Sequence, residues 1–547
     1  MRVLSPGSDA LTPLRSHASS DRVPDHFGAG TRGALRNHLW LTGSSSAADL
    51  GRGFSDTTYV LALAAIVVAG AVLRFSFLAA KSVWLDEAMS VHQISQISSV
   101  LLRGEMPLYH LILYCWARIA GNGEAMLRAP SVFFAIATIP AIAELGTELS
   151  DRATGLLSAL LLTVHETAIQ HAQTARSYAL LMMLVTLASL FFVRSVKRGS
   201  LGNCMGYVIS GISATYAHLF GILILPAQCA SVFFFRPSRR TAGRLVVSAL
   251  AIGTLSLPAF ALAMRGYQGQ DDWIPSITTW AFAQLFYVLA GASRDIIGGS
   301  AAVAFSFSGF RFELGSLLLW FYLAAIGLAM IYPRKPSIAT KAYLLLSIVT
   351  PICLTIIVSH FKHLFVVRYL LIVLPFFVIA AAIGIRRMPW RPAAIAVAAA
   401  ITVMSLVEDY SYYRAPSFQD WRSAVTFVAA RAASGDVLMI YPEYYEIPVQ
   451  YYVGRLRGPA VFPRILLMKD ELQSRAPVKR RDEAVSWNHS VLTSLDPGAR
   501  IWFFSASWDQ DDQRLIAEMQ DDHRVAERPD ISGVRLLLFV PGQNSLR

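Results

Sequence analysis

Long apolar runs separated by short basic clusters constrain this chain more than any other feature of its sequence. A run of about 20 apolar residues matches the hydrocarbon core of a bilayer, so each run is a candidate membrane-spanning helix. Only 15% of the 547 residues are charged and 54% are hydrophobic, which indicates a polytopic α-helical membrane protein. About eleven spans are expected, at residues 57–79, 124–148, 153–171, 178–195, 203–217, 219–235, 244–264, 314–332, 341–359, 368–385 and 392–407.

The basic clusters predict the direction of each span, because Lys and Arg concentrate in cytoplasmic loops. If the Arg-bearing N-terminal tail is inside, eleven spans put every large cluster on the same side as the tail. These clusters are Asp151-Arg152, Arg194/Lys197/Arg198, Arg236/Arg239/Arg240/Arg244, Arg334/Lys335/Lys341 and Arg386/Arg387/Arg391. The net charge of +12 is explained by these loops, and we expect no nucleic-acid binding.

Three domains follow from this topology. Residues 1–56 are polar and rich in Ser, Gly and Arg, which predicts a disordered cytoplasmic tail. Residues 57–408 are expected to form the transmembrane domain, with outer-face loops at 80–123 and 265–313. Residues 409–547 are expected to form a periplasmic or extracellular α/β domain.

Helix-like and strand-like runs alternate in this last region, which favours a mainly parallel sheet. We expect a helix that Ser417 caps and that runs through Ala433. Strands are expected at VLMIY, IWFFS and VRLLLFV, and a helix near 509–520.

An acidic pair, Asp86-Glu87, follows the first span and should lie on the outer face. Carboxylates in the first turn of a surface helix are favoured by the helix dipole, so one of them needs no further explanation. Glu166 is less ordinary, because an ionisable group at the centre of a membrane helix costs on the order of 2.5–3.5 kcal/mol. An internal polar pair with His165 is the alternative to a functional role for Glu166.

Three cations occupy the outer face, where the positive-inside rule expects few. They are Arg176, Lys362 and Arg368, and together they suggest a bound anion. A lipid-linked phosphate suits them, since Arg offers a two-pronged fork and Lys a point charge. Contact with ordinary lipid headgroups is the alternative. Glu105, Tyr178 and His218 complete the outward-facing polar set.

Several motifs, in order, resemble the GT-C class of integral-membrane glycosyltransferases, in particular bacterial relatives of protein O-mannosyltransferases and of the lipid A aminoarabinose transferase. The resemblance covers about residues 57–455 and is carried by SVWLDEAMS, EMPLYH, IQHAQTARSYAL, ATYAHLFG, VVRYLLIVLP and QDWRSAV with GDVLMIY. It implies that Asp86 is the catalytic base. Thr174 stands where many relatives have Glu, and Met106 replaces a Lys, so Glu105 and Glu166 remain candidates for a second acid.

The sequence therefore predicts a multi-pass protein of the cytoplasmic (inner) membrane that moves a sugar from a polyprenyl-phosphate donor, with inversion, to an acceptor on the outer face. The acceptor is an envelope glycolipid, polysaccharide or protein, and the sugar is a hexose or pentose. The predicted roles are catalysis for Asp86 and Glu87 and phosphate binding for Arg176, Arg368 and Lys362. Further site candidates are Glu105, Tyr178, His218 and Glu166.

Two other functions fit the same features. A polysaccharide polymerase or ligase is also polytopic, with Arg residues on large outer loops. A flippase or transporter of lipid-linked sugars would instead place charged groups along a path through the bilayer. The chain has no Gly-rich phosphate loop between a strand and a helix, so no nucleotide cofactor is expected; dependence on a divalent metal stays open.

Overall fold

A computed structural model describes residues 55–103, 106–266, 274, 276–292, 304–307, 310–332, 336–456, 462–470, 478–496, 498–506 and 510–542. Within them, eight helical stretches are long and apolar enough to cross a membrane. They are α1 (Asp56–Phe75), α5 (Glu124–Leu149), α8 (Tyr178–Arg198), α11 (Arg239–Gly266), α13 (Leu314–Ile331), α14 (Ile338–Ser359), η2 (Val367–Val373) continued by α15 (Leu374–Arg386), and α16 (Arg391–Arg414). Each overlaps one predicted span, and the polytopic helical fold is confirmed.

The other three predicted spans are formed by shorter helices. They are α6 (Arg152–Thr163), α7 (Glu166–Ala172), α9 (Leu201–Ala217), η1 (Leu219–Leu223) and α10 (Ile224–Phe235). These helices are shorter than the eight above, and the count of eleven spans stays a prediction.

Arg74, buried in the last turn of α1, explains why the predicted span 153–171 is divided into α6 and α7. Its Nη1 donates to the carbonyl oxygen of Thr163 and its Nη2 to that of Leu162, each at 3.0 Å. In a continuous helix those carbonyls would accept from the amides of residues 166 and 167. The guanidinium group thus takes the place of two helical donors at the break between α6 and α7.

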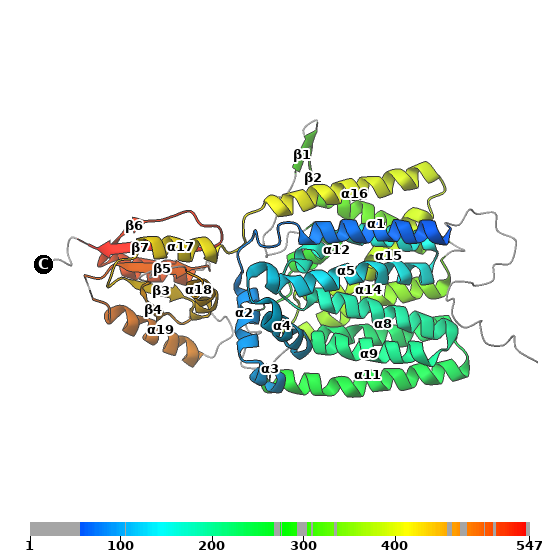
Figure 1. The fold of residues 1–547 in the computed structure, drawn as a ribbon, viewed down its shortest axis with the longest axis horizontal. Coiled ribbons are helices and arrows are strands. Elements are labelled where there is room, and N and C mark those ends of the chain that lie inside the picture. Colours follow the sequence, from blue (N-terminus) through cyan, green and yellow to red (C-terminus); the bar gives the residue numbers. More distant parts are fainter. Residues whose placement is uncertain are drawn as a thin grey trace, which may run out of the picture. The chain divides into compact units, whose positions relative to one another are not determined.

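Helix α15 lies in the core of the helical part, and nearly all of its side chains are buried. It approaches α13 so closely that a Cβ at Gly384 would lie 1.7 Å from the carbonyl oxygen of Ala325. Helices α1, α5, α8, α9 and α11 lie side by side in this order (Figure 1). Exposed apolar side chains on the outer helices, such as Val68 and Leu250, are those expected of helices that face lipid.

Short elements connect the long helices. Between α1 and α5 lie α2 (Leu85–Ser95), α3 (Ile97–Arg103) and α4 (Pro107–Ala120). Helix α4 lies within residues 80–123, which the sequence predicts as an outer-face loop, and Pro107 stands in its first turn, where no amide donor is needed. Before α13 lie α12 (Thr279–Leu289) and the antiparallel hairpin of β1 (Ala304–Phe307) and β2 (Phe310–Glu313).

The C-terminal part is a five-stranded sheet with helices. Its strand order is β4 (Arg464–Leu467), β3 (Val437–Tyr441), β5 (Ile501–Ser505), β7 (Arg535–Pro541) and β6 (His523–Glu527). The helices are α17 (Trp421–Arg431), η3 (Glu443–Tyr445), α18 (Glu446–Val453), α19 (Val478–Thr493) and α20 (Gln510–Gln520). The α/β character is confirmed. The sheet itself is mixed, because β3 pairs in parallel with β4 and β5, whereas β7 pairs antiparallel with β5 and β6.

Both faces of this sheet are buried, since alternate residues of a strand point to opposite sides. On one side Trp502 and Phe504 of β5 join the cluster that contains Trp421 of α17. On the other side Phe503 packs in a separate cluster with Leu515 of α20. Near-continuous apolar strands such as IWFFS are the expected consequence of burial on two faces.

The predicted N-cap of the first helix after α16 is wrong. Helix α17 starts at Trp421, and Asp420 is its N-cap, with Oδ1 accepting from the amide of Ser423 at 3.2 Å. Ser417 lies further upstream, where its Oγ accepts from the amide of Ser82 at 2.9 Å. The hydroxyl therefore binds another part of the chain instead of its own helix.

Candidate active site

Asp86 and Arg368 form the centre of the candidate site. Asp86 lies in the first turn of α2 and Arg368 in η2, and the distance from Asp86 Oδ2 to Arg368 Nη2 is 3.3 Å. The Asp86 side chain keeps 21% of its surface exposed, against 7% for Arg368. The carboxylate is thus both held by a cation and accessible to a second molecule.

Arg176 approaches the same turn of α2 from the segment between α7 and α8. Its Nη1 lies 3.4 Å from the backbone oxygen of Asp86 and 3.4 Å from Ser90 Oγ. Its own backbone oxygen accepts from Ser131 Oγ at 3.2 Å. Burial acts to lower the pKa of Arg176, but the nearby acidic groups, Asp86 first among them, together outweigh it, and the pKa lies above its usual value.

Aromatic rings lie beside the guanidinium group of Arg368. The Tyr178 hydroxyl accepts from Arg368 Nε at 3.0 Å. The Cζ of Arg368 lies 5.9 Å from the ring centroid of Trp84 and 5.8 Å from that of Tyr369, within the range of cation–π attraction. These rings exclude water from one side of the cation, which strengthens its interaction with an anion.

His218 belongs to the same group of side chains. Its ring centroid lies 4.8 Å from that of Tyr369 and 6.0 Å from that of Tyr178. Burial, with Arg176 and Arg368 nearby, lowers the pKa of His218 to about 3. The imidazole is therefore neutral at pH 7 and adds no positive charge.

Glu87, the neighbour of Asp86, has different partners. Arg128 of α5 donates from Nε to Oε1 at 2.8 Å and from Nη2 to Oε2 at 2.7 Å. The amide of Ala175 also donates to Glu87 Oε1 at 2.8 Å. Only 1% of the Glu87 side chain is exposed, so its carboxylate is enclosed by protein donors.

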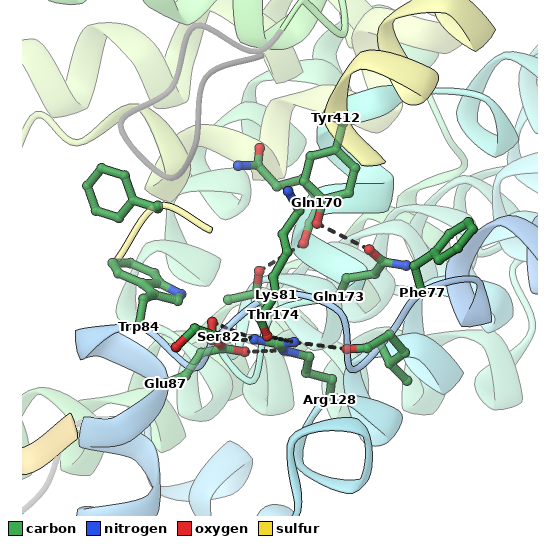
Figure 2. Close-up of a pocket in the computed structure, with 12 residues that line it drawn as sticks. Phe77, Lys81, Ser82, Trp84, Glu87, Arg128, Gln170, Gln173, Thr174 and Tyr412 are labelled. Atoms are coloured by element: carbon green, nitrogen blue, oxygen red, sulfur yellow. Dashed lines mark hydrogen bonds and ion pairs between the residues drawn. The ribbon is translucent and has the colours of Figure 1, made fainter. Parts of the chain in front are cut away.

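Arg128 also holds the chain that leads into α2. Its Nη1 donates to the carbonyl oxygens of Leu78 and Lys81, each at 2.9 Å, and its Nη2 to that of Ser82 at 3.1 Å. One guanidinium group thus links α5, the segment before α2, and α2 itself. Figure 2 shows Arg128 and Glu87 at the border of a small pocket.

Lys81 occupies the middle of this pocket, whose other lining includes Gln170, Gln173, Thr174 and Tyr412 (Figure 2). The Lys81 Nζ donates to the carbonyl oxygen of Ala415 at 2.7 Å and lies 4.7 Å from the Tyr412 ring centroid. Burial lowers the pKa of Lys81 to about 8, against the charge of Glu166, which raises it.

The structure brings five of the predicted residues together: Asp86, Arg176, Tyr178, His218 and Arg368. Glu166 is buried in the first turn of α7, and its charge acts on Lys81 beside the pocket. Lys362 lies half-buried in the turn between α14 and η2. Glu105 lies outside the described residues.

No group of three or more His, Cys, Asp or Glu side chains is placed to hold a metal ion in the part of the chain that the structure describes. Asp86 has two arginines beside it, and these are not metal ligands.

Sequence reasoning missed Arg128 and Trp84. Arg128 lies near the predicted outer end of the span 124–148, so the criterion that selected Arg176 and Arg368 would also have selected it. Trp84 is two residues before Asp86, but nothing in the local sequence shows that its ring faces a guanidinium group. Tyr369 follows Arg368 directly, and the local sequence does not show that its ring lies beside the Arg368 guanidinium group either.

Comparisons with known proteins show which architecture this is. No protein-family model and no curated protein matches the chain. Among solved structures, ArnT from Cupriavidus metallidurans in the apo state matches with a TM-score of 0.58 and 11% identity, over 89% of this chain and 99% of that one. ArnT bound to undecaprenyl phosphate matches with a TM-score of 0.54 and 11% identity, over 90% and 99%. The apo oligosaccharyltransferase of Archaeoglobus fulgidus matches with a TM-score of 0.52 and 12% identity, over 90% and 75%.

The chain therefore has the GT-C fold of integral-membrane glycosyltransferases, as its motifs suggest. The likeness to ArnT extends over nearly the whole of that protein and over most of this chain.

Proposed function

We propose that this protein is a glycosyltransferase that moves a sugar from a polyprenyl-phosphate donor to an envelope acceptor at the outer face of the cytoplasmic membrane. The observation that carries the proposal is the 3.3 Å pair of Asp86 and Arg368, with the Arg176 side chain lying against the same turn of α2. One carboxylate beside two guanidinium groups leaves one positive charge in excess, and a phosphate would balance it.

In the proposed reaction Asp86 accepts the proton of an acceptor hydroxyl as that oxygen attacks the anomeric carbon. The bond from the anomeric carbon to the donor phosphate breaks, and its electron pair leaves with the polyprenyl phosphate. Arg368 and Arg176 stabilise the charge that develops on the leaving phosphate. A single displacement of this kind inverts the anomeric configuration.

Glu87 has a supporting role in this proposal. Its carboxylate already accepts three hydrogen bonds at 2.7–2.8 Å from Arg128 and Ala175, so it is poorly placed to take a substrate proton. We assign it to the positioning of α2, and with it Asp86. Tyr178 orients Arg368 through the 3.0 Å hydrogen bond.

The ArnT crystallised with undecaprenyl phosphate supports a polyprenyl-phosphate donor, since that protein shares the fold. The hydrophobic chain of such a donor would lie against lipid-facing helices, while its phosphate reaches Arg368 at the start of η2. Lys362, six residues before Arg368, is proposed as a further cation for the phosphate.

The test uses purified protein in liposomes with a panel of labelled undecaprenyl-phosphate sugars and extracted envelope lipids, polysaccharides and proteins. Formation of a glycosyl bond that depends on Asp86 is the expected result. Translocation of the donor without any product would instead indicate a flippase. Near-normal transfer by the Asp86→Asn variant would indicate a polymerase or ligase with another base, and no product with any donor would refute the proposal.

A further inference from the structure

The segment Ser82–Leu85, which leads directly to Asp86, is bound by the C-terminal part of the chain. The amide of Ser82 donates to Ser417 Oγ at 2.9 Å, that of Val83 to the Tyr452 hydroxyl at 2.7 Å, and that of Leu85 to Gln419 Oε1 at 3.1 Å. Three backbone donors of a four-residue segment are thus satisfied by side chains that lie more than 330 residues away in sequence.

One of these contacts, that of Gln419, replaces a cap that α2 lacks. The first amides of a helix have no partner within the helix, and a side chain of the N-cap residue usually accepts from one of them. The N-cap of α2 is Trp84, which makes no capping hydrogen bond. Gln419 instead supplies the acceptor for Leu85, the first residue of α2, and is itself held by Trp421 Nε1 at 3.1 Å.

Tyr452 of α18 is the second residue that binds the Ser82–Leu85 segment. Its hydroxyl accepts from Val83 and from Ser82 Oγ, at 2.7 and 3.1 Å, and donates to Glu124 Oε1 at 2.5 Å. Glu124 forms an ion pair with Arg422 of α17 at 2.5 Å. The segment is thereby tied to α5 and to two helices of the C-terminal part at once.

We infer that the C-terminal part of this chain is a required component of the active site, in which Tyr452 and Gln419 are positioning residues that hold the Ser82–Leu85 segment and so orient Asp86. Neither residue contacts the Asp86 carboxylate in the interactions above, and each acts through the backbone. That the C-terminal part holds the Ser82–Leu85 segment is argued from the hydrogen bonds alone. That this orients a catalytic residue, the catalytic part of the inference, rests on the proposed function.

The experiment compares Tyr452→Phe with Tyr451→Phe, an adjacent tyrosine of similar burial whose hydroxyl donates to the carbonyl oxygen of Asn122 at 3.0 Å. Hydrogen exchange of the peptide that contains Ser82–Leu85 is measured by mass spectrometry in the full-length protein. Loss of one hydrogen bond predicts exchange about five- to tenfold faster in Tyr452→Phe and unchanged exchange in Tyr451→Phe. Unchanged exchange in Tyr452→Phe would overturn the inference, whatever reaction the protein catalyses.

A second comparison separates the acceptor role of Gln419 from its bulk. Gln419→Glu keeps an oxygen for the Leu85 amide, whereas Gln419→Met keeps the length of the side chain without an acceptor. We expect kcat of glycosyl transfer to fall about tenfold or more in Gln419→Met and Tyr452→Phe, with partial rescue in Gln419→Glu. The affinity for undecaprenyl phosphate, used as the probe, should stay within about twofold, because the phosphate ligands lie on other elements.

The outcomes distinguish the two proposals. Faster exchange with unchanged kcat would overturn the positioning role and leave the glycosyltransferase proposal intact. If the unaltered protein makes no product, the proposed function fails, and the catalytic part of the inference fails with it. The exchange measurement then still decides whether the C-terminal part holds the segment.

Discussion

The guanidinium group of Arg128 and the carboxylate of Glu87 form a two-pronged ion pair inside the protein, with distances of 2.8 Å from Nε to Oε1 and 2.7 Å from Nη2 to Oε2. Asp86, one residue earlier, pairs with Arg368 instead. Successive residues of an α-helix point about 100° apart, so adjacent acids on α2 reach different cations. This geometry divides the acidic pair into a buried carboxylate, Glu87, and a more accessible one, Asp86.

Breaking the buried pair of Arg128 and Glu87 should therefore lower the stability of the folded protein more than it changes the catalytic step. We expect Glu87→Gln to lower the stability of the folded protein by about 3–5 kcal/mol, because Arg128 keeps an uncompensated buried charge. Thermal unfolding in detergent measures this loss. The control is Glu527→Gln, which breaks the half-exposed pair of Glu527 and Arg431 and should cost less than about 1 kcal/mol. Equal losses in the two variants would contradict the structural role of Glu87.

Asp86→Asn tests the catalytic assignment. The amide keeps the size of the side chain but takes up no proton, so kcat of transfer should fall about 10²- to 10⁴-fold. Asp56→Asn serves as the control, since Asp56 is exposed in the first turn of α1. If transfer by Asp86→Asn reaches a tenth of the normal rate, another group must be the base.

Arg368→Ala tests the donor site. A charge-assisted hydrogen bond contributes about 1.5–3 kcal/mol, so the affinity for undecaprenyl phosphate should fall roughly 10- to 150-fold, as measured by binding in nanodiscs. Arg368→Lys should recover part of this loss, because it keeps the charge without the fork. The matched control is Arg414→Ala, an exposed arginine at the end of α16. A variant that is simply unfolded would show that Arg368 is structural.

The long helices and three of the five strands of the C-terminal sheet could be predicted because their signal is local. Hydropathy along 20 residues indicates a span. Arg176 and Arg368 could be predicted as site residues because they are cations on the predicted outer face, where few are expected. The contact of Tyr452 with Val83 joins residues 369 positions apart, and no local sequence pattern predicts it. Strand direction is equally invisible, since VRLLLFV reads the same in a parallel or an antiparallel pairing.

The break between α6 and α7 shows a different limit. Residues 153–171 are apolar enough for one continuous span, but Arg74 donates to the carbonyls of Leu162 and Thr163. A side chain from another helix thus decides where this one ends. Propensity alone gives no indication of such a tertiary effect.

The lowered pKa of Lys81 predicts a pH dependence of stability. Burial places this pKa at about 8 in the folded protein, below its ordinary value of 10.5. Between these two values the unfolded chain binds more protons than the folded one, so Lys81 makes stability rise with pH across that window. We expect the stability of the unaltered protein, relative to Lys81→Met, to increase from pH 8 to pH 10.5 and to be constant below pH 7. Denaturation in detergent over this range measures it, and a difference independent of pH would show that Lys81 titrates normally.

The C-terminal part is predicted to lie on the outer face of the membrane and the basic loops on the cytoplasmic face. Labelling of engineered cysteines measures this orientation. The four native cysteines, Cys115, Cys204, Cys229 and Cys353, are first replaced by Ala. Ser486→Cys places an exposed thiol on α19 of the C-terminal part, and Ser200→Cys places one in the exposed turn before α9. Because the basic clusters should be cytoplasmic, a membrane-impermeant maleimide added to intact cells should label Ser486→Cys only. Ser200→Cys should become reactive after permeabilisation. The reverse pattern would put Asp86 on the cytoplasmic side and exclude transfer at the outer face.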